Sequence, residues 1–255
     1  MRIIFIGDVV GSAGCEFLSK NAHRLAREYK SDFMIVNGEN SAVGNGLTKK
    51  TADYILRSGA DCITTGNHCF QRYNELDVYD NDNILRPANY PEGNPGHGVY
   101  HADLGKYRIC VINIQGTAFL DPLDNPFAKI DNILSNIDEQ NIFVDFHAES
   151  TAEKQAMGYF LNGRVTAVLG THTHVQTADE KILSKGTAYI TDAGMCGAKD
   201  SILGDKIKPC LDRFIYRYAE RFEQAEGKCI LCGVCIDFNE KSGKATGIER
   251  IQISE

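Results

Sequence analysis

Residues 2–36 read RIIFIGDVVGSAGCEFLSKNAHRLAREYKSDFMIV, and their pattern indicates the architecture of the chain. The apolar run over residues 2–7 predicts a β-strand, and residues 12–29 carry apolar side chains at helical spacing. Residues 32–36 predict a second strand. A strand, a helix and another strand in this order imply a parallel sheet whose strands are joined by crossover helices.

The same alternation continues along the chain. A turn-rich loop is expected over residues 87–98, which hold three of the six prolines. We find no internal repeat or linker, so we expect a single domain over residues 1–255, built as a mixed α/β sandwich. Further strands are expected over residues 61–64, 107–114, 142–146, 165–169, 187–191, 230–237 and 247–253, and further helices over 48–58 (with Thr48 as N-cap), 129–137, 151–161 and 207–218.

The composition is that of an ordinary globular protein. Of its 255 residues, 43% are hydrophobic and 24% are charged, which argues against a disordered chain or a coiled coil. The 27 basic and 34 acidic residues give a formal net charge of −7 without a long basic run, so stable nucleic-acid binding is not expected. The apolar segments are too short for a membrane span or a signal peptide, so we expect a cytoplasmic protein.

The nine cysteines are odd in number and no secretory signal is evident, so we expect reduced thiols. Cys229, Cys232 and Cys235 form a C-x-x-C-x-x-C series that could suggest iron–sulfur ligation, but Asn239 stands where the fourth ligand would follow. The same segment predicts a strand on which Cys229 and Cys235 share one face and Cys232 lies on the other. We therefore interpret these thiols as small buried apolar groups.

Polar residues of unusual types follow five of the expected strands, at the point where each strand ends. In open α/β sheets, ligands bind beyond the carboxyl ends of the strands, so we expect these side chains to meet at one rim. Four of the seven histidines lie in these segments. The segments are Gly7-Asp8, Asn37-Gly38-Glu39-Asn40, Gly66-Asn67-His68, His147 and Gly170-Thr171-His172-Thr173-His174.

These residue types favour a metal centre, because carboxylates, amide oxygens and neutral imidazoles bind zinc, manganese and iron. The set is too large for one tetrahedral ion and fits two ions that share a carboxylate, an arrangement that serves phosphoryl hydrolysis. Two divalent ions with two carboxylates and a hydroxide leave the site net positive, which suits a phosphate anion. On an extended backbone, His172 and His174 would point both rings the same way. The candidate ligands are Asp8, Glu39, Asn40, Asn67, His147, His172 and His174.

Together these segments resemble the binuclear metallophosphoesterases, whose patterns are D-x-H, G-D-x-x-D, G-N-H, H and G-H-x-H. The match is closest to the YmdB-like branch. Val10 in place of the histidine of D-x-H, and Glu39-Asn40 in place of G-D-x-x-D, both follow that branch, and they leave the preferred metal open. The branch's hallmarks occur here as IGDVVG at residues 6–11, NGEN at 37–40, RPAN at 86–89, DFHAE at 145–149 and GTHTHVQT at 170–177.

The resemblance implies a four-layer α/β/β/α sandwich of the calcineurin-like type. It also implies a phosphodiesterase that hydrolyses 2′,3′-cyclic nucleotides to nucleoside monophosphates through a metal-bridging hydroxide. The cofactors would be two metal ions, most often iron or manganese, with zinc or magnesium as further options. The chain would assemble as a homo-oligomer.

The resemblance also assigns roles to individual residues. His68 would be the catalytic residue that protonates the leaving alkoxide, a role that suits an imidazole because its pKa lies near neutral pH. Glu39 would bridge the two ions. The implied ligand sets are Asp8, Glu39, Asn40 and His174 for one ion, and Glu39, Asn67, His147 and His172 for the other.

Other interpretations stay open at this point. The same core could serve a phosphomonoesterase or a protein phosphatase, which the absence of an obvious basic cluster disfavours. The chain could also be a metal- or nucleotide-binding regulator with little catalysis. Arg86 could position a phosphate or a nucleobase, or form a structural salt bridge, and Glu149 could orient His147 or another ligand. Cys69 is expected near the metals as an oxidation-sensitive bystander, and His97 at the surface, where it could meet substrate.

Overall fold

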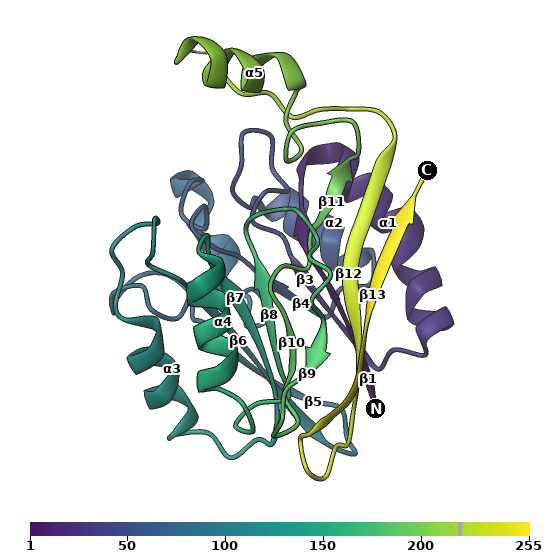
Figure 1. Ribbon diagram of the computed structural model, residues 1–255, viewed down its shortest axis with the longest axis vertical. Coiled ribbons are helices and arrows are strands. Elements are labelled where there is room, and N and C mark those ends of the chain that lie inside the picture. Colours follow the sequence, from purple (N-terminus) through teal and green to yellow (C-terminus); the bar gives the residue numbers. More distant parts are fainter. Residues whose placement is uncertain (219–220) are drawn as a thin grey trace.

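The computed structural model describes residues 1–218 and 221–255 as two β-sheets packed face to face, with helices on both outer sides (Figure 1). Helices α1 (Gly11–Tyr29) and α2 (Lys49–Arg57) cover one sheet. Helices α3 (Pro126–Leu134) and α4 (Thr151–Phe160) cover the other. The layers therefore run α/β/β/α, which confirms the expected sandwich.

The first sheet joins the two ends of the chain. Strands β1, β3 and β4 are parallel, as the strand–helix alternation predicts, whereas β12 from the C-terminal region runs antiparallel to β1. The order is β2-β11-β12-β1-β3-β4, with β13 also paired to β12. The strands are β1 (Arg2–Ile6), β2 (Asp8–Val9), β3 (Phe33–Asn37), β4 (Cys62–Thr64), β11 (Met195–Ala198), β12 (Cys229–Phe238) and β13 (Ala245–Ser254).

The second sheet has a parallel centre and antiparallel edges. Strands β6, β7, β8 and β10 are parallel, while β5 and β9 run antiparallel to their neighbours. The order is β5-β6-β7-β8-β10-β9. The strands are β5 (Val99–Asp103), β6 (Arg108–Gln115), β7 (Asn141–His147), β8 (Ala167–Thr171), β9 (Lys181–Ile182) and β10 (Ala188–Ile190).

Three apolar cores hold the four layers together. Because successive side chains of a strand point to opposite faces, Phe5 packs between the two sheets while Ile4 packs toward α1. The third core lies between the second sheet and its helices, where Ile130 of α3 and Met157 of α4 are fully buried. Both faces of each sheet are thus covered, as is usual for parallel sheets.

Most of the expected elements are confirmed, with small shifts of their ends. Thr48 caps α2 as predicted, since its side chain accepts a hydrogen bond from the N–H of Thr51. Helix α3 begins at Pro126, not at residue 129. The reason is that Asn125 caps it and proline suits the first helical turn. Strand β5 and the short strands β2, β9 and β11 were not predicted. The last three are too short for an alternating pattern to stand out.

The cysteines are buried and reduced, as expected. Cys229 and Cys235 pack in the core beneath α1, whereas Cys232 lies on the opposite face of β12, against Gly194. The interpretation of this series as structural is therefore confirmed.

Helix α5 (Ile207–Tyr216) stands apart from the sandwich and projects from the top of the view in Figure 1. Its exposed side chains include large apolar ones. Within the described residues, no helix is both long and apolar enough to cross a bilayer.

Candidate metal centre

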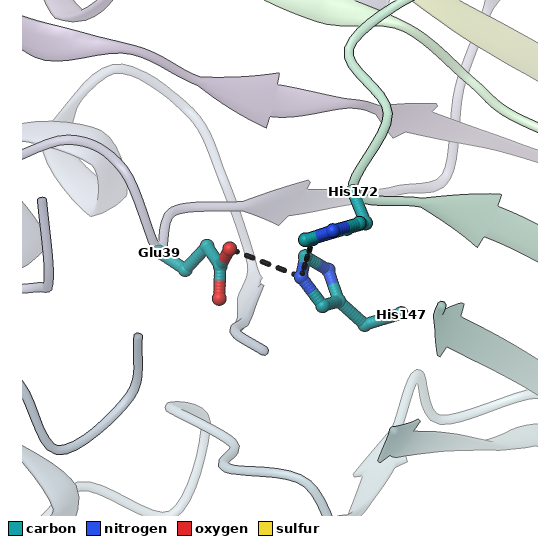
Figure 2. Close-up of side chains that lie close together, drawn as sticks. All are labelled: Glu39, His147 and His172. Atoms are coloured by element: carbon teal, nitrogen blue, oxygen red, sulfur yellow. Dashed lines mark hydrogen bonds and ion pairs between the residues drawn. The ribbon is translucent and has the colours of Figure 1, made fainter. Parts of the chain in front are cut away.

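Potential ligand atoms converge on one imidazole nitrogen at the end of β7. His147 Nε2 lies 3.0 Å from Glu39 Oε1 and 3.0 Å from His172 Nδ1. It also lies 2.9 Å from Asn67 Oδ1. Figure 2 shows Glu39, His147 and His172 meeting from three separate segments, which follow or end strands β3, β7 and β8.

Gly66 permits this close approach. A Cβ atom at residue 66 would lie 2.1 Å from His147 Cδ2. Only glycine therefore lets the loop that carries Asn67 and His68 sit against the imidazole.

The arrangement fits a metal ion better than a network of hydrogen bonds. An imidazole nitrogen carries at most one proton, so His147 Nε2 can donate to only one of its three neighbours. Ligand atoms about 2.0–2.2 Å from a metal lie roughly 3 Å from one another, which matches the spacing around His147 Nε2. One carboxylate, one amide oxygen and two imidazoles form a suitable donor set for a divalent ion.

A second group of predicted ligands adjoins Glu39. His174 Nε2 lies 3.6 Å from Asp8 Oδ1 and 3.1 Å from Asn40 Nδ2. Asn40 Nδ2 also lies 3.3 Å from Glu39 Oε1. Because Asn40 presents its nitrogen to this group and its oxygen to His68, ligation through its oxygen requires the amide to turn over. The seven predicted ligands thus lie in two adjoining groups.

The backbone at His172 and His174 is not extended, so the parallel orientation of the two rings that an extended backbone would give does not arise. The φ angle is 96° at His172 and 62° at His174, in the left-handed region that residues with a side chain rarely adopt. As a result, the two rings diverge: His172 contacts His147, and His174 contacts Asp8. Each such residue costs about 1–3 kcal/mol, so other contacts must hold the segment in this shape.

A hydrogen-bond relay behind His147 supports the tautomer that a metal ligand needs. His147 Nδ1 lies 2.9 Å from Thr171 Oγ1, and this hydroxyl donates to Asp145 Oδ1 at 2.7 Å. When Nδ1–H is donated to the hydroxyl, Nε2 keeps its lone pair for the ligand cluster. No role was predicted for Thr171 or Asp145, although both lie inside the segments DFHAE and GTHTHVQT.

Thr171→Val is expected to weaken Mn²⁺ binding by about 10–100-fold, because His147 Nδ1 loses its acceptor and the ring loses its fixed orientation. Calorimetric titration of the metal-free protein measures the change. Thr64→Val is a matched control, since Thr64 Oγ1 also donates to Asp145, at 2.5 Å, but makes no contact with His147. An equal loss of affinity in both variants would contradict a role specific to His147.

Glu149 acts on His172, not on His147. Its Oε2 lies 3.0 Å from His172 Nε2, which leaves Nδ1 of that ring for the ligand cluster. The sequence left open whether Glu149 contacts His147 or another candidate ligand, and the structure shows that it contacts His172.

Protonated histidines balance the buried carboxylates of the metal-free chain. Burial opposes ionisation of Asp8 and Glu39, but the charges of His174 and His147 outweigh it and lower the pKa of both carboxyl groups. Although burial disfavours the imidazolium, the Asp8 carboxylate raises the pKa of His174 to about 9. Burial, together with the charge of His147, lowers the pKa of His172 to about 4. Metal binding must therefore displace protons from this site.

The metal-free protein is expected to lose stability as the pH rises from 6.5 through 9. The pKa of His174 is about 9 when folded and about 6.5 when unfolded, so the folded chain holds an extra proton in this window. That contribution, of order 3 kcal/mol at most, is complete below pH 6.5 and is lost above pH 9. Thermal unfolding in the presence of a chelator measures it. His174→Gln should show a flatter profile, and identical profiles would contradict the assignment.

His68 stands at the edge of the ligand cluster. Its backbone N–H donates to Glu39 Oε2 at 3.1 Å, and its Nδ1 lies 2.9 Å from Asn40 Oδ1. Its side chain is 28% exposed, so a bound molecule can reach it. His68 lines a cleft of about 260 Å³, whose other lining residues are Val10, Glu39, Asn40, Asn45, Glu149, His172, Thr173, His174, Leu203 and Asp205. A larger groove of about 510 Å³ beside α1 and α2 contains none of the predicted ligands.

Three further residues singled out in the sequence lie outside the cleft lining. Arg86 is buried and donates to the carbonyl oxygens of Pro95 and Pro87, so among the described residues it makes backbone hydrogen bonds and not the salt bridge that the sequence left open. Cys69 packs in the core, and burial raises the pKa of its thiol to about 12, which argues against ready oxidation. His97 lies partly exposed and contacts the carbonyl oxygen of Val99.

Comparison with known proteins establishes the family. The family described as YmdB-like protein matches residues 4–251. The chain belongs to the YmdB-like family. The resemblance inferred from the sequence is therefore confirmed.

Two relatives are similar to this YmdB-like chain over its full length. It is 49% identical, over 100% of the chain and 98% of the relative, to the 2′,3′-cyclic-nucleotide 2′-phosphodiesterase of Bacillus subtilis (strain 168). The crystal structure of a novel phosphatase from Mycoplasma pneumoniae is 35% identical to this chain. It has a TM-score of 0.95 and covers 100% of this chain and 93% of the other.

A more distant structure shares the fold alone. The sulfate thiohydrolase SoxB of Thermus thermophilus is 9% identical, with a TM-score of 0.55 over 96% of this chain and 43% of the other. The four-layer sandwich is thus found in a hydrolase of very different sequence.

Proposed function

We propose that this chain is a metal-dependent phosphodiesterase that hydrolyses 2′,3′-cyclic nucleotides. The observation that carries the proposal is the convergence of ligand atoms on His147 Nε2, beside a cleft that His68 lines. The Bacillus subtilis relative, 49% identical over the full chain, is named for this activity. From that name we take the 2′ ester bond as the one that breaks.

Two groups of side chains are proposed to hold two ions that share Glu39. The ligand atoms are oxygens and imidazole nitrogens without thiolates, which suits manganese or iron, with zinc or magnesium as further options. When bound, such ions activate water and polarise phosphoryl oxygens. The proposed ligands are Asp8, Glu39, Asn40 and His174 for one ion, and Glu39, Asn67, His147 and His172 for the other.

The proposed reaction opens the five-membered cyclic phosphate. A water oxygen forms a bond to phosphorus and releases one proton to the solvent, the bond from phosphorus to O2′ breaks, and O2′ takes up a proton. We assign the donation of that proton to His68. When the Asn40 amide turns over to offer its oxygen to the ion, its Nδ2 faces Nδ1 of His68 and donates to it, so Nε2 is the nitrogen that carries the proton toward the cleft. The product is a nucleoside 3′-phosphate.

The lining of the cleft favours a diester over a monoester. Among the described residues that line it, none is a lysine or an arginine. A monoester dianion needs more compensating positive charge than a diester monoanion, so the phosphomonoesterase alternative is not favoured. The complete ligand set, with His68 beside it, argues against a regulator without catalysis.

Hydrolysis of 2′,3′-cyclic AMP by the purified protein with Mn²⁺ tests the proposal. We expect 3′-AMP as the single product, no turnover in EDTA, and recovery when Mn²⁺ is added back. Parallel assays with bis-p-nitrophenyl phosphate and p-nitrophenyl phosphate compare diester with monoester hydrolysis. A 2′-AMP product would reverse the assigned bond. Absence of turnover by a protein shown to contain metal would overturn the assigned activity.

We also propose that the chain forms a homo-oligomer through α5. Four side chains spaced for one helix face are exposed by 45–70%, namely Ile207, Leu211, Phe214 and Ile215. Exposed apolar patches of this kind often mark protein–protein contacts. Light scattering of the protein and of its Phe214→Ser variant tests this: the wild type should be oligomeric and the variant dissociated. A monomeric wild type would disprove it.

Three further expectations from the sequence remain proposals. A single domain over residues 1–255 is supported by the pairing of β1 with β12 and of β12 with β13, which joins both ends of the chain in one sheet. The cytoplasmic location and the absence of nucleic-acid binding rest on the sequence alone.

A further inference from the structure

A buried carboxylate holds the strained segment that carries His172 and His174. Thr173, between the two histidines, donates its N–H at 3.0 Å and its hydroxyl at 2.8 Å to Oδ2 of Asp192. Asp192 is fully buried. These two hydrogen bonds hold Thr173 in place. The residues on either side of it, His172 and His174, both have positive φ angles.

A buried cation holds Asp192 in turn. Lys154 of α4 places Nζ 2.7 Å from the same Oδ2, and both side chains are at most 1% exposed. Gly170 leaves room for this pair, since a Cβ atom there would lie 1.8 Å from the Thr191 carbonyl oxygen and 3.2 Å from Lys154 Cδ. A buried charge without its partner is strongly destabilising, so Lys154 and Asp192 stay paired and hold the loops around them in place.

The other oxygen of Asp192 reaches a second segment that carries a ligand. Oδ1 accepts a hydrogen bond from the N–H of Gly194 at 2.8 Å. The Gly194 carbonyl oxygen accepts one from the N–H of Asp8 at 3.0 Å. A single carboxylate therefore links the segments that carry Asp8, His172 and His174.

We infer that Asp192, neutralised by Lys154, is a positioning residue for the candidate metal centre. It holds the backbone in the shape that directs His172 and His174 into different groups of ligands. It acts through Thr173 and Gly194, not by ligation. The inference rests on the proposed function, because it concerns ligands assigned there.

Asp192→Asn is expected to raise the Mn²⁺ dissociation constant of the metal-free protein by about 10–100-fold, as loss of a ligand-orienting contact does elsewhere. Calorimetric titration measures the constant, and turnover should recover when Mn²⁺ is raised. Asp179→Asn is the matched control. The Asp179 carboxylate accepts hydrogen bonds from Thr177 and Thr191 in the same region. It makes no hydrogen bond to residues 172–174, the segment that carries His172 and His174. The control should lose thermal stability and keep its Mn²⁺ affinity.

Thr173→Val provides a second variant that leaves the Lys154–Asp192 pair intact and removes one hydrogen bond to Asp192. We expect its Mn²⁺ affinity to fall about 10-fold, and this variant decides the matter if Asp192→Asn does not fold. Unchanged affinity in the folded variants, or an equal loss in Asp179→Asn, would overturn the inference. A wild-type protein that binds no Mn²⁺ would overturn the proposed function itself, and the two failures are therefore distinguishable.

Discussion

His68→Ala is expected to lower kcat for 2′,3′-cyclic AMP by about 10²–10⁴-fold while the bound metal content stays the same. The side chain lines the cleft, and its Nδ1 lies 2.9 Å from Asn40 Oδ1 and 3.5 Å from Glu39 Oε1. Since His68 is not itself a proposed ligand, its removal leaves all seven ligand side chains present. What is lost is the proton for the departing O2′. Turnover assays and elemental analysis of the same preparation measure the two quantities together.

The leaving group provides a sharper version of this experiment. A diester with a p-nitrophenolate leaving group needs little protonation, so His68→Ala should lose much less activity on bis-p-nitrophenyl phosphate than on the cyclic nucleotide. His97→Ala is the control, because His97 is a partly exposed histidine outside the cleft lining. Equal losses on both substrates, or a loss of metal, would argue against a proton donor and for a structural role.

Glu39→Gln is expected to release metal and to lower kcat/KM by at least about 10³-fold, which corresponds to about 4 kcal/mol of lost transition-state stabilisation. Glu39 is fully buried and its carboxylate adjoins both ligand groups, at His147 and at Asn40. Glutamine keeps the shape but supplies a neutral oxygen, so the site loses one negative charge. Metal content, measured after dialysis, should fall together with activity.

Glu153→Gln is the matched control for Glu39→Gln. Glu153 also holds backbone N–H groups, those of Thr117 and Ala118 in the loop after β6, but it contacts none of the predicted ligands. It should keep its metal and most of its activity. Retention of two metal equivalents by Glu39→Gln would show that Glu39 does not bridge them.

Local patterns in the sequence were sufficient for much of this protein. The apolar runs and their order predicted the parallel strands, because strands buried on both faces need continuous apolar residues. Polar residues that follow these runs predicted that their side chains meet at one edge of the sheet, because the carboxyl ends of parallel strands share an edge. In this way Glu39, Asn67 and His147 became candidate ligands, and the structure brings Glu39 and Asn67 within 3.0 Å of His147 Nε2. The motif spacing was specific enough to identify the family.

Other features depend on residues far apart in the chain, and no local period reveals them. The divergence of His172 and His174 follows from backbone angles that Asp192 holds through Thr173, and Asp192 in turn depends on Lys154. The pairing of β12 with β1 likewise joins opposite ends of the chain. The sequence supplied the kinds of ligand and the strand ends that carry them. The directions of the ligand side chains were set by tertiary contacts, because a side chain's direction depends on the hydrogen bonds and buried charges that surround its backbone.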